Sequence, residues 1–172
     1  LDLCAGSGCV GLAVAKFCPG SHVVLGELME GALRVCRRNI RRSGLTSQVM
    51  PWQVDALDGP PPRFGEFDCI VSNPPYIRRC ESRSMSANVL EYEPHIALFV
   101  PNESPLLFYE KIAKDSVRLL SPGGKLYFEI NEAQGEACAR MLEAAGYKHI
   151  RIIKDLYEKN RFVSAIKPIR HG

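Results

Sequence analysis

The sequence has no long apolar run and almost no surplus of either charge. Its apolar segments have the length of strands and are interrupted by charged residues, glycine or proline, whereas a helix that spans a bilayer needs about 20 apolar residues. Lysine and arginine number 22 against 19 aspartates and glutamates, and a net charge of +3 does not by itself indicate a nucleic-acid partner. These features exclude a disordered, collagenous or coiled-coil chain and predict no contact with a membrane. The 172 residues suffice for one globular domain with a sizeable core.

Paired cysteines and clustered histidines are also missing. The seven cysteines are an odd number without a CxxC pair, and most lie among apolar neighbours, where free thiols pack as small hydrophobic side chains. The four histidines are dispersed and show no helical metal-ligand spacing. The sequence therefore predicts no metal site and favours a reducing compartment, either the cytoplasm or, if a transit peptide precedes the chain, an organelle matrix.

The chain opens inside a structural element. It begins at Leu1 without a methionine and passes within three residues into a glycine-rich loop. We therefore expect the start of the first strand, and any targeting signal, to lie upstream of this sequence.

Apolar segments of strand length alternate with segments of helical period, which is typical of an α/β domain with a mainly parallel sheet. Strands are predicted over 1–3, 22–27, 48–54, 67–73, 125–131, 147–154 and 161–167. Helices are predicted after Gly8 and over about 29–43, 105–120 and 132–145. Pro51 places the third strand near a sheet edge or at a bulge, because proline cannot donate to a strand ladder. The segments 57–66 and 77–104 are interpreted as a surface turn and a long loop, and loops of the second length are usually functional.

A glycine-rich loop, Asp2-Leu3-Cys4-Ala5-Gly6-Ser7-Gly8, joins the first strand to the first helix. Glycines let the backbone approach a ligand, and Glu27, at the end of the second strand, is placed to accept hydrogen bonds from ribose hydroxyls. Asp55 follows the third strand, where an acid could reach an adenine amino group. Gly6, Gly8 and Gly11 also satisfy G-x-G-x-x-G, so this segment alone allows a dinucleotide site, an S-adenosylmethionine site or a tight turn without a ligand.

A second motif, Asn73-Pro74-Pro75-Tyr76, directly follows the fourth strand and so lies at the carboxyl end of the sheet beside the expected crevice. Two consecutive prolines fix φ and remove two N–H donors, which leaves a rigid turn with outward carbonyl acceptors. The Asn73 side chain adds another acceptor, and Tyr76 offers a flat face for stacking. Together they predict a cradle for the planar NH₂ group of an amide or a base.

Such a conjugated nitrogen is a poor nucleophile, because its lone pair is delocalised. Hydrogen bonds from both N–H groups to the cradle return electron density to the nitrogen. A sulfonium methyl is strongly electrophilic, so alignment and preorganised dipoles can supply much of the rate, up to about 7–11 kcal/mol in favourable systems. No general base is required, since water can take the proton from the methylated cation.

With these residues identified, the chain resembles the HemK/PrmC-type family, the S-adenosylmethionine-dependent methyltransferases that modify the glutamine of the GGQ motif in peptide-chain release factors. The resemblance rests on DLxxGSG and SNPPYI (72–77), and then on Tyr92-Glu93-Pro94, Ala97-Leu98, Phe108-Tyr109, Pro122-Gly123-Gly124, Glu129-Ile130, Gln134-Gly135-Glu136-Ala137, Ala144-Ala145-Gly146-Tyr147, Lys154-Asp155-Leu156 and Asn160-Arg161. Each of these signals is weak, but their order along nearly the whole chain is specific.

The resemblance implies a class I, Rossmann-like methyltransferase domain over residues 1–172, with a seven-stranded, mainly parallel sheet, helices on both faces and an antiparallel last strand. It implies a cofactor site, for S-adenosylmethionine and its product S-adenosylhomocysteine, that contains Cys4, Ala5, Gly6, Ser7, Gly8, Glu27, Asp55, Ala56 and Asn73. It places the glutamine at Asn73 to Tyr76, with the Asn73 side chain and the Pro74 carbonyl accepting the amide hydrogens. Cys4 stands where the family usually has glycine and Glu27 where it usually has aspartate, and the family's upstream helical domain is not present in this sequence.

Two other functions remain open from the sequence. Adenine N6 amino-methyltransferases of DNA or RNA use the same Asn-Pro-Pro-Tyr chemistry on a flipped base, although 172 residues leave no target-recognition domain. A catalytically inactive binding module with the same fold is the second alternative. Dinucleotide oxidoreduction ranks last, because no hydride-handling residues accompany the loop.

A basic stripe is predicted on the second helix, opposite Leu33, Cys36 and Ile40. Its members are Arg34, Arg37, Arg38, Arg41 and Arg42. A solvated outer face is the favoured interpretation, and a contact with ribosomal RNA or an acidic protein patch is the alternative. For Glu91, Tyr92, Glu93 and Pro94, in the long loop, two interpretations stay open: they shape the substrate pocket, or they belong to an ordinary solvated loop. We expect a monomer.

Overall fold

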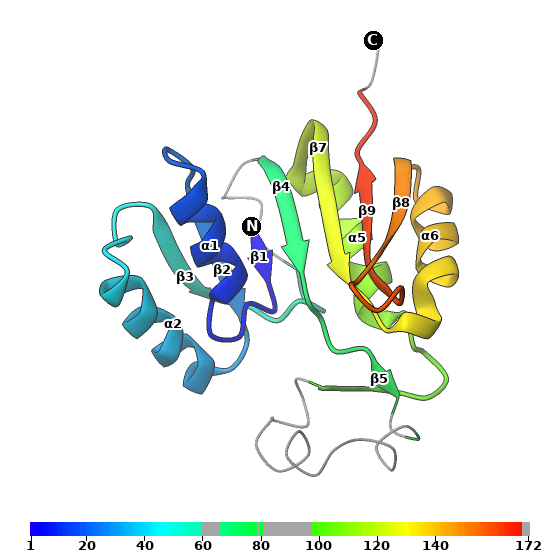
Figure 1. Ribbon diagram of the computed structural model, residues 1–172, viewed down its shortest axis with the longest axis horizontal. Helices are drawn as coiled ribbons and strands as arrows, with labels where there is room; N and C mark the ends of the chain where they lie inside the picture. Colours follow the sequence, from blue (N-terminus) through cyan, green and yellow to red (C-terminus); the bar gives the residue numbers. More distant parts are fainter. Residues whose placement is uncertain (60–65, 79, 81–97, 170–172) are drawn as a thin grey trace.

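The computed structural model describes residues 1–59, 66–78, 80 and 98–169. Its main sheet has seven strands in the order β3-β2-β1-β4-β7-β9-β8, and β9 runs antiparallel to both of its neighbours (Figure 1). The strands are β1 (Asp2–Leu3), β2 (Val23–Glu27), β3 (Val49–Gln53), β4 (Phe67–Ser72), β7 (Leu120–Glu129), β8 (Lys148–Lys154) and β9 (Asn160–Ile166). The predicted class I topology, including the antiparallel last strand, is confirmed.

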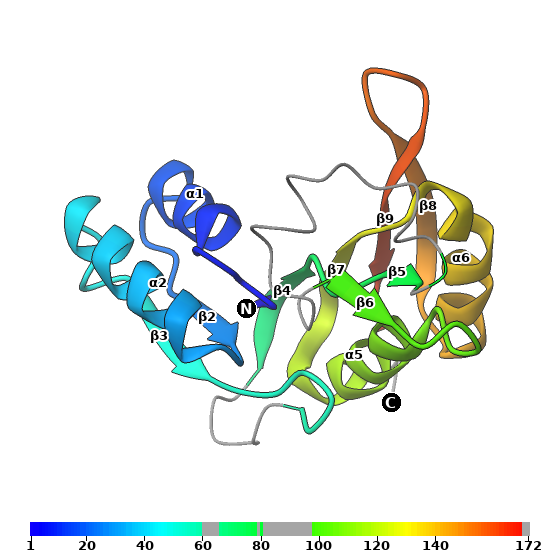
Figure 2. The same ribbon diagram turned by 90° about the horizontal axis from the view of Figure 1, so that it is seen from below.

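Helices cover both faces of the sheet. They are α1 (Cys9–Phe17), α2 (Glu30–Arg42), α5 (Leu107–Leu119) and α6 (Gly135–Ala144), the last preceded by a 3₁₀ turn, η3 (Glu132–Gln134). Figures 1 and 2 show α1 and α2 on one face, with α5 and α6 on the other. Each of these helices packs on the strand that follows it in the chain, as is usual where a helix connects two strands of one sheet.

Each face of the sheet has its own apolar cluster. Beneath α1 and α2, Leu25 and Cys36 are fully buried; beneath α5 and α6, the largest buried side chains are Tyr109, Phe128 and Tyr147. Tyr109 meets Phe128 edge to face, with ring centroids 5.2 Å apart. Burial of each such side chain stabilises the fold by about 1.5–3 kcal/mol. The rigid sheet that results fixes where the strands end.

Strand β3 lies at the edge of the sheet, as predicted from Pro51. The other edge strand, β8, is joined to β9 by a hairpin whose turn lies at the carboxyl edge of the parallel strands. In Figure 1 the arrows of β4 and β7 point to this edge, and the arrow of β9 points away from it.

Two predictions about the elements are wrong in part. Strand β7 begins at Leu120, not at residue 125, because Leu120 pairs with Phe67 across an irregularity in the ladder, and the Pro-Gly-Gly segment continues the strand. The segment 77–104, interpreted as a loop, contains β5 (Ile77–Arg78) and β6 (Phe99–Val100), which form a separate parallel pair. Tyr92-Glu93-Pro94, Glu91 and Ala97 lie outside the described residues.

Candidate active site

A pocket of about 730 Å³ opens at the carboxyl edge of β1, β2 and β4. It is formed by the segments that follow the first four strands, which is where open α/β sheets bind ligands. Of the predicted site residues, its wall contains Cys4, Ala5, Gly6, Ser7, Glu27, Asp55, Ala56, Asn73, Pro74, Pro75 and Tyr76. Both predicted motifs therefore face one cavity.

Gly8 is the exception among the predicted residues, because it is buried beneath the loop and is not part of the pocket wall. Its φ of 84° favours glycine, and an added Cβ would lie 2.8 Å from Leu25 Cδ1. Gly11 is packed still more tightly: its Cβ would lie 2.2 Å from Leu25 Cδ2. These two glycines allow α1 to pack closely on β2, which is the structural role of the later glycines in such loops.

Gly6 differs from them because an added Cβ would meet nothing within 4 Å, although its φ is 57°. Its backbone is thus open on the side where a ligand would approach. The loop is supported from below by α2, since Asn39 Nδ2 donates to the Ser7 carbonyl at 3.0 Å and the Cys36 thiol donates to the Gly6 carbonyl at 3.0 Å. Sequence reasoning missed this support because the contact joins residues that are far apart in the chain.

Cys4, which departs from the family's usual glycine, has a φ of 59°. A non-glycine residue in this left-handed region costs about 1–2 kcal/mol. Burial raises the pKa of the Cys4 thiol to about 12, so the thiol is neutral at physiological pH and does not serve as a nucleophile. Cys9, at the start of α1, is an exposed thiol on the pocket wall, and its sulfur lies 3.1 Å from Ser7 Oγ.

Glu27 connects the loop to the start of α2. Its Oε2 accepts a hydrogen bond from the Gly6 amide at 2.8 Å, and its Oε1 accepts one from the Met29 amide at 2.9 Å. A carboxylate oxygen can accept more than one hydrogen bond, so Glu27 is able to bind ribose hydroxyls while it holds the loop. Asp55 is similar: its Oδ1 accepts from the Leu57 amide at 2.8 Å. Open backbone at Gly6 and two acids at these positions fit the ribose and adenine of S-adenosylmethionine.

Asp2 is a pocket residue that sequence reasoning did not select. Its Oδ2 accepts a hydrogen bond from the Gly11 amide at 2.9 Å in a buried position. Desolvation raises the pKa of Asp2 to about 6, partly opposed by that hydrogen bond. The signal in the sequence that could have identified Asp2 is its position, as an acid at the start of the glycine-loop segment. Asp2 fixes the register of α1 against β1.

The acceptor turn begins where β4 ends. The Ser72 hydroxyl donates to the Leu3 carbonyl at 2.8 Å and so holds the ends of β4 and β1 together. Asn73 is exposed at the pocket wall, while Pro74 and Pro75 are buried. The buried prolines therefore fix the backbone of the turn, while the exposed Asn73 side chain lines the same pocket as the glycine loop.

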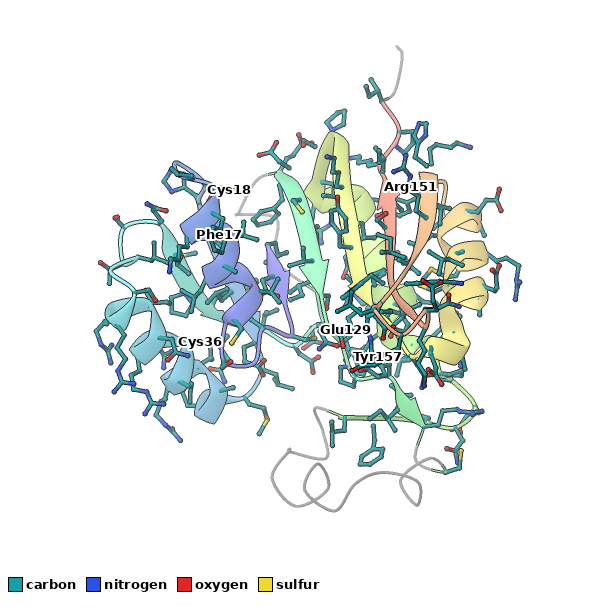
Figure 3. All side chains as sticks on the ribbon, viewed as in Figure 1. Phe17, Cys18, Cys36, Glu129, Arg151 and Tyr157 are labelled. Atoms are coloured by element: carbon teal, nitrogen blue, oxygen red, sulfur yellow. The ribbon has the colours of Figure 1, made fainter. Side chains whose placement is uncertain are left out.

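A chain of polar contacts extends from this turn to the β8–β9 hairpin. The Tyr76 hydroxyl donates to Glu129 Oε1 at 3.5 Å, and Arg161 Nη1 lies 3.8 Å from the same oxygen. Arg161 also donates to Asp155 Oδ2, with Nη2 at 3.3 Å. Burial, followed by the Glu129 charge, raises the pKa of Tyr76, so its hydroxyl remains a donor. Figure 3 shows Glu129 at the end of β7, facing the hairpin.

The remaining pocket wall is apolar and includes residues that the sequence did not indicate. Val10, Leu28, Met29, Val54, Leu57, Ile77, Leu98 and Phe108 complete it. Of these, Ile77, Leu98 and Phe108 belong to segments quoted for the family resemblance. Leu98 lies near the end of the segment predicted as the long loop and Phe108 in the first turn of α5, so this part of the wall is supplied by the chain that follows Tyr76.

Outside the pocket, α2 buries Leu33, Cys36 and Ile40, and its arginines lie on the outer side as predicted. Arg37 forms an ion pair with Glu30 at 2.7 Å, and the other four are exposed. Among the described residues there is no group of three or more His, Cys, Asp and Glu side chains that could hold a metal ion. In the same part of the chain, every helix is too short or too polar to cross a membrane.

Comparison with known families finds one model, described as "Methyltransferase small domain", that matches residues 1–92. A release factor glutamine methyltransferase from Bacteroides thetaiotaomicron is 43% identical over 96% of this chain and 59% of its own length. The corresponding protein of Clostridium acetobutylicum is 36% identical over 96% of this chain and 58% of its own length. The chain thus spans less than two thirds of the curated relatives it matches.

A methyltransferase from Pyrococcus furiosus shares the fold. Its crystal structure superposes with a TM-score of 0.71 at 20% identity, over 98% of this chain and 74% of its own. The structural match agrees with the class I architecture, and the family match implies S-adenosylmethionine as the methyl donor.

Proposed function

Because this chain belongs to the methyltransferase small-domain family, we propose that it is the catalytic domain of a protein-glutamine N5-methyltransferase. The acceptor is the glutamine of the GGQ motif of a peptide-chain release factor. The single observation that supports this function best is that the Asn73-Pro74-Pro75-Tyr76 turn and the glycine loop share the wall of one pocket.

The cofactor half of the site is formed by Gly6, Glu27 and Asp55. S-adenosylmethionine, when bound, supplies an electrophilic methyl group. Glu27 is placed for the ribose hydroxyls and Asp55 for the adenine amino group, while the open backbone at Gly6 allows close approach. Asp2, Cys4, Ala5, Ser7 and Ala56 complete this half, and Gly8 supports it from beneath.

The acceptor half orients the glutamine amide. The Asn73 side chain and the Pro74 carbonyl accept the two N–H groups, which directs the nitrogen lone pair toward the glycine loop. The Tyr76 ring packs against the flat amide, and its hydroxyl is held by Glu129. Proximity and preorganised dipoles then provide the acceleration. The proton leaves to water, so the site requires no general base.

The release factor as substrate is supported by the names of the relatives and by the extent of the match, 96% of this chain at 43% identity. We further propose that the whole chain forms one domain and acts as a monomer in the cytoplasm, in keeping with its bacterial relatives. The exposed arginines of α2 are proposed to be solvated, with contact to ribosomal RNA or to an acidic patch of the protein substrate as the alternative. Reversing the charge of Arg38 and Arg42 should leave transfer to the release factor unchanged at every salt concentration, and a salt-dependent loss would favour the contact with an acidic patch of the release factor.

The decisive experiment is mass spectrometry of the release factor after incubation with the protein and S-adenosylmethionine. One methyl group on the GGQ glutamine supports the proposal. Methylation of adenine in a duplex DNA or RNA supplied in parallel, with none on the glutamine, would replace it by the amino-methyltransferase alternative. Cofactor binding by calorimetry without any transfer would indicate the inactive module.

A further inference from the structure

The turn of the β8–β9 hairpin exposes two large apolar side chains. Leu156 is 100% exposed and Tyr157 is 84% exposed, more than any other large apolar residue in the described ranges. Exposed apolar surface of this kind does not stabilise the fold. Adjacent apolar residues at one projecting point favour contact with another molecule.

The turn is fixed in place by hydrogen bonds and ion pairs. Asp155 Oδ1 accepts from the Tyr157 amide at 2.8 Å and from the Lys159 amide at 3.1 Å, and the Asp155 amide donates to the Lys159 carbonyl at 2.8 Å. Lys159 forms an ion pair with Glu132 at 2.9 Å. Leu156 and Tyr157 are therefore held on a preorganised turn, and binding through them requires little ordering of the backbone.

The hairpin turn lies at the substrate end of the pocket. Arg161 contacts both Asp155 of the turn and Glu129, and Glu129 in turn accepts from Tyr76 of the acceptor motif. In Figure 3 both Glu129 and Tyr157 are labelled at the carboxyl edge of the sheet. Figure 2 shows the hairpin projecting past α6, toward the side of the sheet that carries α1 and α2. The turn that carries the exposed pair is thus joined through Asp155, Arg161 and Glu129 to Tyr76 of the acceptor half.

The pocket itself has the volume of a small-ligand site, about 730 Å³. It has room for a cofactor and one side chain, so affinity for a folded protein has to come from surfaces outside it. We infer that Leu156 and Tyr157 are a docking point for the folded release factor, packing on an apolar patch beside the loop that presents the glutamine. This inference rests on the proposed function and adds a contact that selects a folded protein over a free peptide.

The test compares two substrates, the folded release factor and a short peptide with the same GGQ sequence. In the double variant Leu156→Ser/Tyr157→Ser, KM for the folded protein should rise about tenfold or more, as expected for loss of an aromatic anchor, with kcat unchanged. The value of kcat/KM for the peptide should stay the same. Phe17→Ser is the matched control, because Phe17 is 78% exposed but lies at the opposite edge of the sheet (Figure 3). It should change neither substrate's kinetics.

The outcomes separate the inference from the function on which it rests. If the wild-type protein methylates the release factor but the double variant has an unchanged KM for it, the docking inference alone is overturned. If the variant loses activity on both substrates equally, the pair acts on the pocket and not on docking, which also overturns it. If the wild-type protein transfers no methyl group to either substrate, both the function and the inference fail. Thermal unfolding of each variant verifies that it folds.

Discussion

The two halves of the pocket are built in different ways. In the cofactor half, Glu27 and the two close-packed glycines hold the loop through backbone hydrogen bonds and tight packing within the first two strand–helix units. In the acceptor half, the Asn73 turn depends on buried prolines and on Glu129 and Arg161, which come from the far end of the chain. The first half is a local structure, whereas the second forms only when the whole sheet is assembled. Changes to the two halves should therefore affect different measured quantities.

The largest effect is expected at Asn73. Asn73→Ala removes one of the two proposed acceptors for the amide, and removal of a preorganised polar group of this kind lowers kcat by about 10²–10³. Because Asn73 is also predicted to touch the cofactor, the affinity for S-adenosylmethionine, measured by calorimetry, should fall as well, but far less than kcat. Asn39→Ala is the reciprocal variant, because Asn39 supports the Ser7 carbonyl beneath the glycine loop: it should weaken cofactor binding and leave kcat at saturating cofactor intact. The same response from both variants would contradict the division into halves.

At Gly11 the expected effect is on folding. Gly11→Ala places a Cβ 2.2 Å from Leu25 Cδ2, and overpacking of this kind destabilises by about 1–3 kcal/mol. Gly31→Ala, in the exposed first turn of α2, is the control, since its Cβ meets only the tip of Arg34 at 3.8 Å. It should stabilise the protein by about 0.5–1 kcal/mol. Urea unfolding of both variants measures the difference, and equal midpoints would show that α1 can shift away from β2.

A pH effect is expected from Asp2. Burial raises its pKa from 3.8 to about 6 in the folded state, so the folded protein takes up this proton more readily than the unfolded chain. The contribution of Asp2 to stability is therefore full below pH 4 and is lost as the pH rises through 6, an effect of about 2–3 kcal/mol. Asp2→Asn keeps the acceptor for the Gly11 amide and should flatten this part of the stability curve. The measurement is the free energy of unfolding of both proteins as a function of pH. Equal slopes for the wild type and the variant between pH 4 and 6 would contradict a contribution from Asp2.

The smallest effect is expected at Arg161. Arg161→Ala removes the side chain that bridges Asp155 and Glu129, and so weakens the support of the Tyr76 hydroxyl. The value of kcat should fall about tenfold, equivalent to about 1.4 kcal/mol, at unchanged cofactor affinity. Lys159→Ala serves as control, because the Lys159–Glu132 ion pair belongs to the same hairpin without reaching Tyr76. If both variants have wild-type kcat, the acceptor turn is held by its prolines alone.

The same contrast explains what could be predicted from the sequence. The glycine loop, the Asn73 turn and the buried face of α2 follow from spacing over a few residues, and each was predicted at the correct position. The pairing of β5 with β6 was missed because two-residue strands have no periodicity, and the start of β7 was misplaced because proline and two glycines carry no strand signal in the sequence. The contact between Glu129 and Arg161 was not predictable, since it depends on the insertion of β9 beside β7.

The exposed thiol of Cys9 lies where its chemical modification can report whether the pocket is occupied. Cys9 shares the wall with the glycine loop, whereas Cys4, Cys36 and Cys138 have thiols whose pKa is raised by burial. A maleimide dye should thus modify Cys9 early, along with Cys18 and Cys80, which lie outside the pocket wall. Protection of Cys9 alone by added nucleoside would follow cofactor occupancy in the unmodified protein, with no turnover assay needed.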